Sequence, residues 1–264
     1  MTTPTQPIPL SSPGRAANHR EEFAFALHLI LKAQELFVNR PEPYRRTLGD
    51  KLMSLGLSLG ISTSRACFVL AERDPLCCCV CARPYLEFAL RLLWASREPD
   101  GMDRVFATYA ADHQANVGKL ATVRPEFKEL VEATQSAAPL ASLTQKRAPD
   151  LRATIEQIGR RDSADGVSTL YADAEEYDLS IGYLHNFSHA NPLTLSLEPG
   201  DALPTGANAV VNATLALLRT IGYRLHWEQE SIVHIAIGIS SFEPLTDLEK
   251  DSIRTESVQS GGTA

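Results

Sequence analysis

Two pairs of polar residues at one-turn spacing carry the chemistry that this sequence could perform. Arg83 and Glu87 are four residues apart within residues 77–95, a segment that is otherwise almost entirely apolar, and His185 and His189 have the same spacing in a later segment. Charged groups among core-forming residues are costly to remove from water, so they face either solvent or a specific partner. The spacing therefore predicts a polar site between helices, although it does not define a reaction.

The first pair belongs to a longer polar stripe. At 100° per residue, Arg83, Glu87 and Arg91 fall within an arc of about 80° on one helix, and Glu98 lies in the same arc. One interpretation is a solvent-exposed stripe in which each Arg–Glu contact adds a few tenths of a kcal/mol. The alternative is an inter-helix pocket, in which Glu87 accepts a proton while Arg83 and Arg91 bind an anion through bidentate contacts.

Residues 167–190 are predicted to form one long helix with a second polar face. That face carries Tyr171, Asp178, Gly182, His185 and His189. We expect Tyr171 and Asp178 to bind a ligand and the two histidines to exchange protons with it. The alternative is structural, because histidines near the C-terminus of a helix interact favourably with its dipole.

The sequence leaves the cofactor unknown and does not indicate a zinc site. Its cysteines, an odd number, are confined to Cys67, Cys77, Cys78, Cys79 and Cys81. This clustering is not a disulfide framework, lacks the second ligand pair of a zinc site, and favours a reducing cytoplasm with the thiols in the core.

A di-metal site is a further alternative, because carboxylates and imidazoles recur at turn spacing. The candidate ligands are Glu87, Asp178, His185, His226, Glu230 and His234. Helical di-metal proteins use such residues, but the familiar Glu-x-x-His pairing is absent, so no metal ligand is assigned.

Composition limits the class of protein. The 264 residues are 44% hydrophobic and carry a net charge of −7, which suits one helical domain in the cytoplasm. An acidic chain is a poor partner for non-specific binding to nucleic acid. The N-terminus does not resemble a secretory signal, and no run of about 18 uninterrupted apolar residues predicts a membrane span.

Helical spacing dominates the chain. Phe23, Ala26, Ile30, Ala33 and Phe37 mark one face of a first helix that ends near Asn39. Further helices are predicted at residues 43–70 (broken near 61–64), 75–97 (kinked at Pro84), after Pro99, and at 125–137, 150–161, 167–190 and 208–229, with possible strands at 193–197 and 231–239. His113 is predicted to be a core histidine. The prediction is an all-α bundle of about seven to nine helices over residues 18–243, between a disordered arm (1–17) and a flexible tail (244–264).

Two stretches together resemble a known family. They are CARPYLEFALRLLWAS and, about a hundred residues later, YLHNFSHANP. They resemble a widespread bacterial all-helical domain family of unknown function, whose members typically show Arg-x-x-x-Glu in an apolar helix and a later Ser-x-x-x-His. Arg83 and Glu87 match the first motif and His189 the second, whereas His185 stands where the family has serine. Over about residues 20–230, the resemblance implies a helical bundle with a role in bacterial stress or phage defence.

That family is in turn reminiscent of the helical HEPN ribonucleases, whose hallmark is Arg-x4-6-His. Arg219 and His226 have this spacing. Three functions therefore remain open. The first is a hydrolase or ligand binder with its site between the two motif helices. The second is an interaction module without catalysis, and the third is the carboxylate–histidine di-metal protein described above. Its partner would be an unknown small molecule or protein, and a homo-oligomer is possible.

Overall fold

The described part of the chain is almost entirely helical. The computed structural model describes residues 19–39, 47–71, 74–124, 126, 128–129, 132, 147–165, 178–189 and 199–225. No strand occurs among these residues, and seven α-helices account for most of them. The predicted all-α fold class is thus confirmed. The predicted arms, the possible strands and most of the predicted helix at 125–137 lie outside the described residues.

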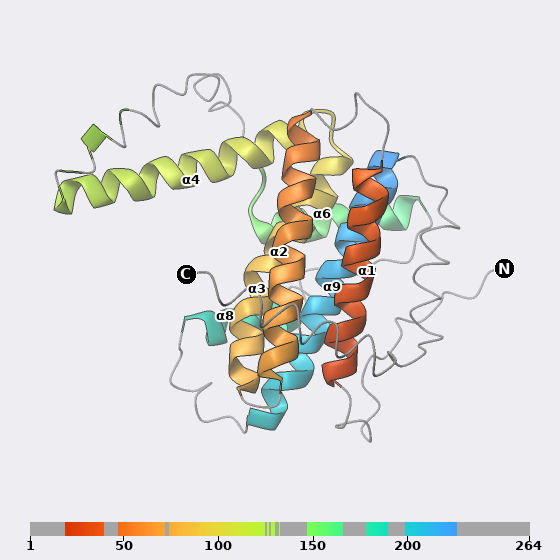
Figure 1. The fold of residues 1–264 in the computed structure, drawn as a ribbon. Coiled ribbons are helices and arrows are strands. Elements are labelled where there is room, and N and C mark those ends of the chain that lie inside the picture. Colours follow the sequence, from red (N-terminus) through yellow and green to blue (C-terminus); the bar gives the residue numbers. More distant parts are fainter. Residues whose placement is uncertain are drawn as a thin grey trace.

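Four helices form the body of the fold. The elements in chain order are α1 (His19–Val38), α2 (Leu48–Leu70), α3 (Pro75–Ser96), α4 (Gly101–Val123), α6 (Leu151–Ala164), the π-helical turn η4 (Asp178–Gly182), α8 (Tyr183–Ser188) and α9 (Pro199–Leu225). Each of α1, α2, α3 and α9 packs on its neighbours to make a four-helix bundle, as Figure 1 shows. Helices α4, α6 and α8 pack on α3 from outside the bundle, so α3 contacts more elements than any other described helix.

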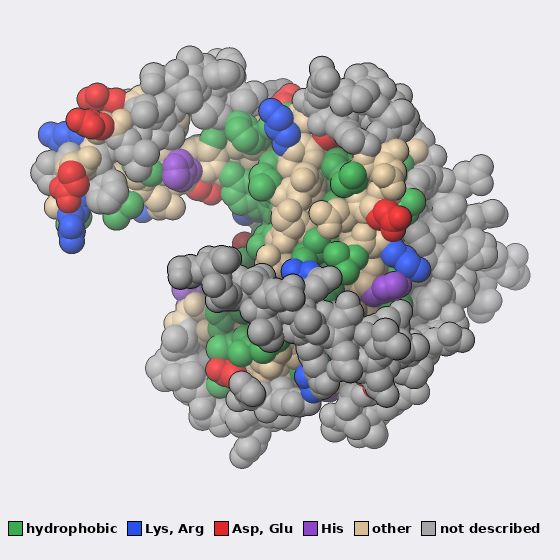
Figure 2. Space-filling model, in the orientation of Figure 1, with side chains coloured by type: hydrophobic (Ala, Val, Ile, Leu, Met, Phe, Trp, Pro, Cys, Tyr) green, Lys and Arg blue, Asp and Glu red, His purple; other side chains and the backbone are tan. Residues whose placement is uncertain are grey.

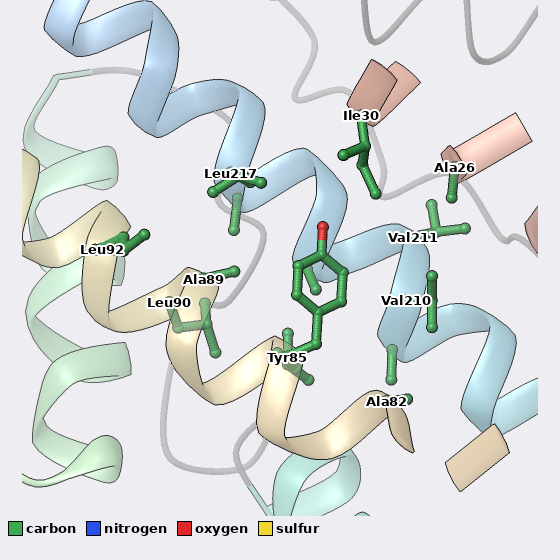
Figure 3. Close-up of a cluster of buried hydrophobic side chains, with 14 of the residues drawn as sticks. Ala26, Ile30, Ala82, Tyr85, Ala89, Leu90, Leu92, Val210, Val211 and Leu217 are labelled. Atoms are coloured by element: carbon green, nitrogen blue, oxygen red, sulfur yellow. The ribbon is translucent and has the colours of Figure 1, made fainter. Parts of the chain in front are cut away.

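The core lies along the interface between α3 and α9. Figure 3 shows Tyr85 of α3 projecting toward α9, with Ala82 and Val210 close by. The Tyr85 hydroxyl is satisfied by Thr214 Oγ1 of α9 at 3.2 Å. Burial raises the pKa of Tyr85, so this phenol is a neutral structural group. Trp94 is also buried and donates its indole N–H to Gln157 of α6 at 2.7 Å.

The starts of three helices follow from local capping chemistry. Thr47 and Asp50 form a capping box at α2, in which each side chain accepts from the other residue's backbone N–H. Asp74 caps α3 by accepting from the N–H of Cys77, with proline in the first turn, and Asp150 caps α6. These signals lie in the sequence itself, which is why the predicted starts of α3 and α6 are confirmed to within a residue.

The predicted break in the second helix is wrong. Helix α2 is continuous through residues 61–64, and both Thr63 and Ser64 are buried within it. Its glycines have a packing role. A Cβ on Gly60 would lie 2.8 Å from the Tyr85 hydroxyl oxygen, and one on Gly56 would lie 3.0 Å from Leu92. Close approach of α2 to α3 therefore outweighs the low helix propensity of glycine.

Three other predictions need correction. Helix α9 begins at Pro199, before the predicted residue 208, and contains Pro204. His113 is exposed rather than buried, because the second half of α4 extends away from the bundle (Figures 1 and 2). The described part of the predicted 167–190 helix is not uniform, since a π-helical turn precedes α8.

One described helix, α2, is long and apolar enough to cross a membrane by length and composition, and half of its most apolar stretch is buried inside the bundle.

Candidate functional site

Arg83 and Glu87 form an ion pair on the outer face of α3. Glu87 Oε1 accepts hydrogen bonds from Arg83 Nε at 3.0 Å and from Arg83 Nη2 at 2.8 Å. The two side chains are only 16% and 27% exposed. The pair is thus half-buried. It is neither fully solvated nor sealed in the core, so it matches neither interpretation of the stripe completely.

A third hydrogen bond of Arg83 joins the two motif segments. Arg83 Nη1 donates to Ser188 Oγ at 2.5 Å, across 105 residues of sequence. Ser188 ends α8 and lies between His185 and His189 in the chain. The guanidinium carries five N–H groups, so two of them donate to no residue that the structure describes. Arg83 is therefore fixed from two sides and still has donors to offer.

Apolar contacts hold α8 in this position. Leu184 is fully buried and Phe187 is 6% exposed, and both belong to the same core cluster as α3. Tyr183 packs edge-to-face on Phe187, with ring centroids 5.2 Å apart. With the apolar face of α8 packed against the core, the opposite face presents His185 outward.

The two histidines lie side by side. The rings of His185 and His189 have centroids 4.1 Å apart and are tilted by 45°, and both residues are exposed. Loss of water lowers the pKa of His185 below its ordinary 6.5, as do the charges of Arg83 and His189, while Glu87 opposes the shift. Because the pKa is lowered, His185 is mostly neutral at pH 7 and able to accept a proton.

Arg91 extends the site toward α4. Its guanidinium lies over the ring of Tyr109, 5.4 Å from the centroid, and its buried Nε has no hydrogen-bond partner in the described part of the chain. Burial raises the pKa of Tyr109 to about 12; Arg91 lowers it in part, and Glu87 contributes a smaller upward shift. Arg83, Glu87, Arg91, Tyr109, His185, Ser188 and His189 are called the α3–α8 site below.

Two other candidates are not brought to this site. Asp178 lies 3.9 Å from Arg152 of α6 and is 62% exposed. The π-helical turn at Asp178–Gly182 explains the position of Asp178. An α-helix would place Asp178 and His185 on the same face, and the wider π-helical turn moves Asp178 off that face. Glu98, predicted in the Arg83 stripe, instead pairs with Arg161 of α6 beyond the end of α3. Tyr171 is outside the described residues.

Arg219, the arginine of the HEPN-like spacing, belongs to a buried ion cluster. Asp162 of α6 is fully buried and accepts from Arg97, the residue that follows α3, and from Arg219 Nη1 of α9, the latter at 3.3 Å. Arg97 also lies over the ring of Tyr223, 4.3 Å from its centroid. Arg219 thus helps to join three helices; the second residue of that spacing, His226, lies outside the described residues.

The described residues contain no group of three or more histidine, cysteine or acidic side chains that could hold a metal ion. Asp178 is separated from the others by its pairing with Arg152. The remaining candidate ligands, His226, Glu230 and His234, lie outside the described residues. Within the described residues, the site's chemistry is therefore that of guanidinium, carboxylate, hydroxyl and imidazole groups.

Sequence reasoning missed two members of the site. Ser188 falls between the two histidines, and the family motif places serine four residues before histidine instead. Tyr109 shares a helical face with Phe106, and this spacing is typical of core residues. The sequence feature that could have assigned Tyr109 to the site is its phenol, since a buried tyrosine needs a polar neighbour.

Comparison of the chain with protein-family models, curated proteins and solved structures finds no match.

Proposed function

We propose that the protein binds an anionic small molecule at the α3–α8 site and acts on it by acid–base chemistry, as a hydrolase does. The observation that supports this most is the hydrogen bond from Arg83 to Ser188, because it ties the Arg–Glu pair of α3 to the helix that carries both histidines. A cation, a carboxylate and imidazoles that meet on one half-buried face are the usual components of such a site.

Each residue has a distinct role in this proposal. Arg83 and Arg91 attract the anion, and Glu87 orients Arg83 by accepting two of its hydrogen bonds. His185, neutral at pH 7, takes a proton from the attacking water. His189, whose ring lies beside that of His185, acts in its protonated form and gives its own proton to the leaving group; exchange with solvent then restores both histidines. The substrate carries phosphate or carboxylate, the two anions that guanidinium groups bind in bidentate fashion.

The test uses Arg91, because its replacement breaks no described ion pair. Inorganic phosphate titrated into the protein should shift the imidazole NMR signals of His185 and His189. Arg91→Gln should weaken this binding about tenfold, as expected for loss of a charged hydrogen-bond donor. Arg152→Gln is the matched control: it removes the same charge from the exposed surface of α6 and should leave binding unchanged.

Catalysis is tested separately with p-nitrophenyl phosphate and with mono-p-nitrophenyl succinate, an ester that carries a carboxylate. We expect turnover of at least one of them by the parent protein, and a loss of about 100-fold in His185→Ala, a typical effect of removing a general base. Failure of phosphate to shift either histidine, together with no turnover of either ester, contradicts the proposed function.

A second candidate is an interaction module, favoured by the fact that Glu87 and Ser188 already occupy three N–H groups of Arg83. In this case the pair holds α3 and α8 together. Glu87→Ala should then lower the free energy of unfolding by about 1–3 kcal/mol, since a half-buried arginine loses its partner. Thermal melts of Glu87→Ala and His189→Ala decide: parent-like melting of both variants excludes the structural role.

The biological setting stays a prediction. The resemblance noted above implies a bacterial stress or phage-defence function, and the acidic composition and free cysteines suit a cytoplasmic protein. A homo-oligomer also stays a prediction.

A further inference from the structure

Two buried cysteines face each other where α2 passes into α3. Cys67 Sγ lies 3.7 Å from the backbone oxygen of Cys78, and Cys78 Sγ lies 3.6 Å from the backbone oxygen of Cys67. Both residues have no exposed surface. Because the contacts are reciprocal, each side chain reaches across to the other residue's backbone, and the two thiols share one site. A disulfide requires this close spacing of the two backbones.

The other cysteines are less suited to react. The Cys77 thiol donates to Asp74 Oδ2 at 2.9 Å, and that hydrogen bond raises its pKa to about 11. Burial raises the pKa of Cys79 to about 12 and also raises that of Cys81. Cys78 differs from all of these, because a hydrogen bond from the Cys67 thiol lowers its pKa. The thiolate is the nucleophilic form of cysteine.

We propose that Cys67 and Cys78 are a redox pair that forms an intrachain disulfide between α2 and α3 when the protein meets a hydroperoxide. The Cys78 thiolate attacks the terminal oxygen of the peroxide, breaks the O–O bond and becomes a sulfenic acid, while the other oxygen leaves and takes up a proton. The Cys67 sulfur then attacks the sulfenic sulfur and displaces water. The two sulfurs lose two electrons, and the peroxide gains them.

This pair fits a reducing compartment. A cytosolic dithiol stays reduced until an oxidant appears, so the disulfide is a modification and not part of the folding framework. Both thiols are buried, so the oxidant has to be as small as hydrogen peroxide or to reach them when α2 and α3 separate by local unfolding. The inference does not rest on the proposed function, because it involves no residue of the α3–α8 site.

The test is disulfide mapping of the full chain. Trypsin separates the two cysteines, because Cys67 falls in peptide 66–73 and Cys78 in peptide 74–91. The folded protein is treated with hydrogen peroxide, the peroxide is removed, the chain is unfolded in denaturant with an alkylating reagent present so that every free thiol reacts, and the digest is analysed without reduction. We expect a mass loss of two hydrogens per chain and one dominant cross-linked peptide, with fragment ions that place the bond at Cys78.

Single variants assign the bond. Cys67→Ser should abolish the cross-link, whereas Cys79→Ala, which removes another buried thiol of the same helix, should retain it. Two results overturn the proposal even if a variant fails to fold, since both are read from the parent protein. One is a cross-link from Cys67 to a cysteine other than Cys78. The other is complete alkylation of Cys67 after peroxide treatment.

Discussion

Replacement of Asp162 by asparagine tests whether the buried ion cluster holds α3, α6 and α9 together. The carboxylate is fully buried between the guanidinium groups of Arg97 and Arg219. Asparagine keeps the size of the side chain and removes its charge. Arg97 and Arg219 then lose the buried carboxylate that they share, and removal of one member is the costly way to break a buried ion pair.

The expected loss follows from the burial of each partner. Removing one member of a buried ion pair costs about 3–5 kcal/mol. The Arg97 side chain is 6% exposed and that of Arg219 is 16% exposed, so water can partly solvate Arg219 in the variant. We therefore expect the lower end, about 3 kcal/mol. For a chain of this size, each kcal/mol lowers Tm by about 2–4 °C, which predicts a decrease of roughly 6–12 °C.

Thermal unfolding followed by circular dichroism measures the effect. Glu156→Gln is the matched control on the same helix, because its partners Arg152 and Arg160 are 54% and 74% exposed and such surface pairs contribute at most about 1 kcal/mol each. Asp162→Asn should melt well below both the parent and this control. The reasoning is refuted if Asp162→Asn and Glu156→Gln melt within about 2 °C of each other, since burial then makes no difference.

Three further predictions test particular contacts. Gly60→Ala should lower the free energy of unfolding by about 1 kcal/mol, because its Cβ would meet the buried Tyr85 ring. Gly118→Ala should raise the free energy of unfolding by a similar amount, because the added Cβ has open space around it. Urea unfolding of both variants measures the sign of each change. Asp50 is buried, which opposes its ionisation, but hydrogen bonds from Arg224 and the cap of α2 lower its pKa below 3.8. The stabilisation of the fold by the ionised Asp50 carboxylate is therefore present above about pH 4 and lost as the pH falls further. Asp50→Asn should thus remove part of the acid sensitivity of Tm. The NMR titration of His185 should have a midpoint below 6.5, and a midpoint at or above 6.5 contradicts the environment described for it.

Local patterns in the sequence determined the helices. The apolar spacing from Phe23 to Phe37 predicted α1, which ends at Val38, and proline at the first position predicted the start of α3. The polar stripe of Arg83 and Glu87 was also visible, because residues one turn apart share a face of any helix. Such features depend only on neighbours within a few residues, so a single chain reveals them.

Packing between distant segments decided the rest. Ser188 became the partner of Arg83 because apolar residues of α8 dock that helix on α3, and a π-helical turn directed Asp178 toward α6. The glycines of α2 look like helix breakers by propensity, but they let α2 approach Tyr85. Periodicity specifies which face of a helix is apolar, but not which other helix covers it. The members of a site between helices therefore follow from tertiary contacts, whose free energy exceeds local preferences.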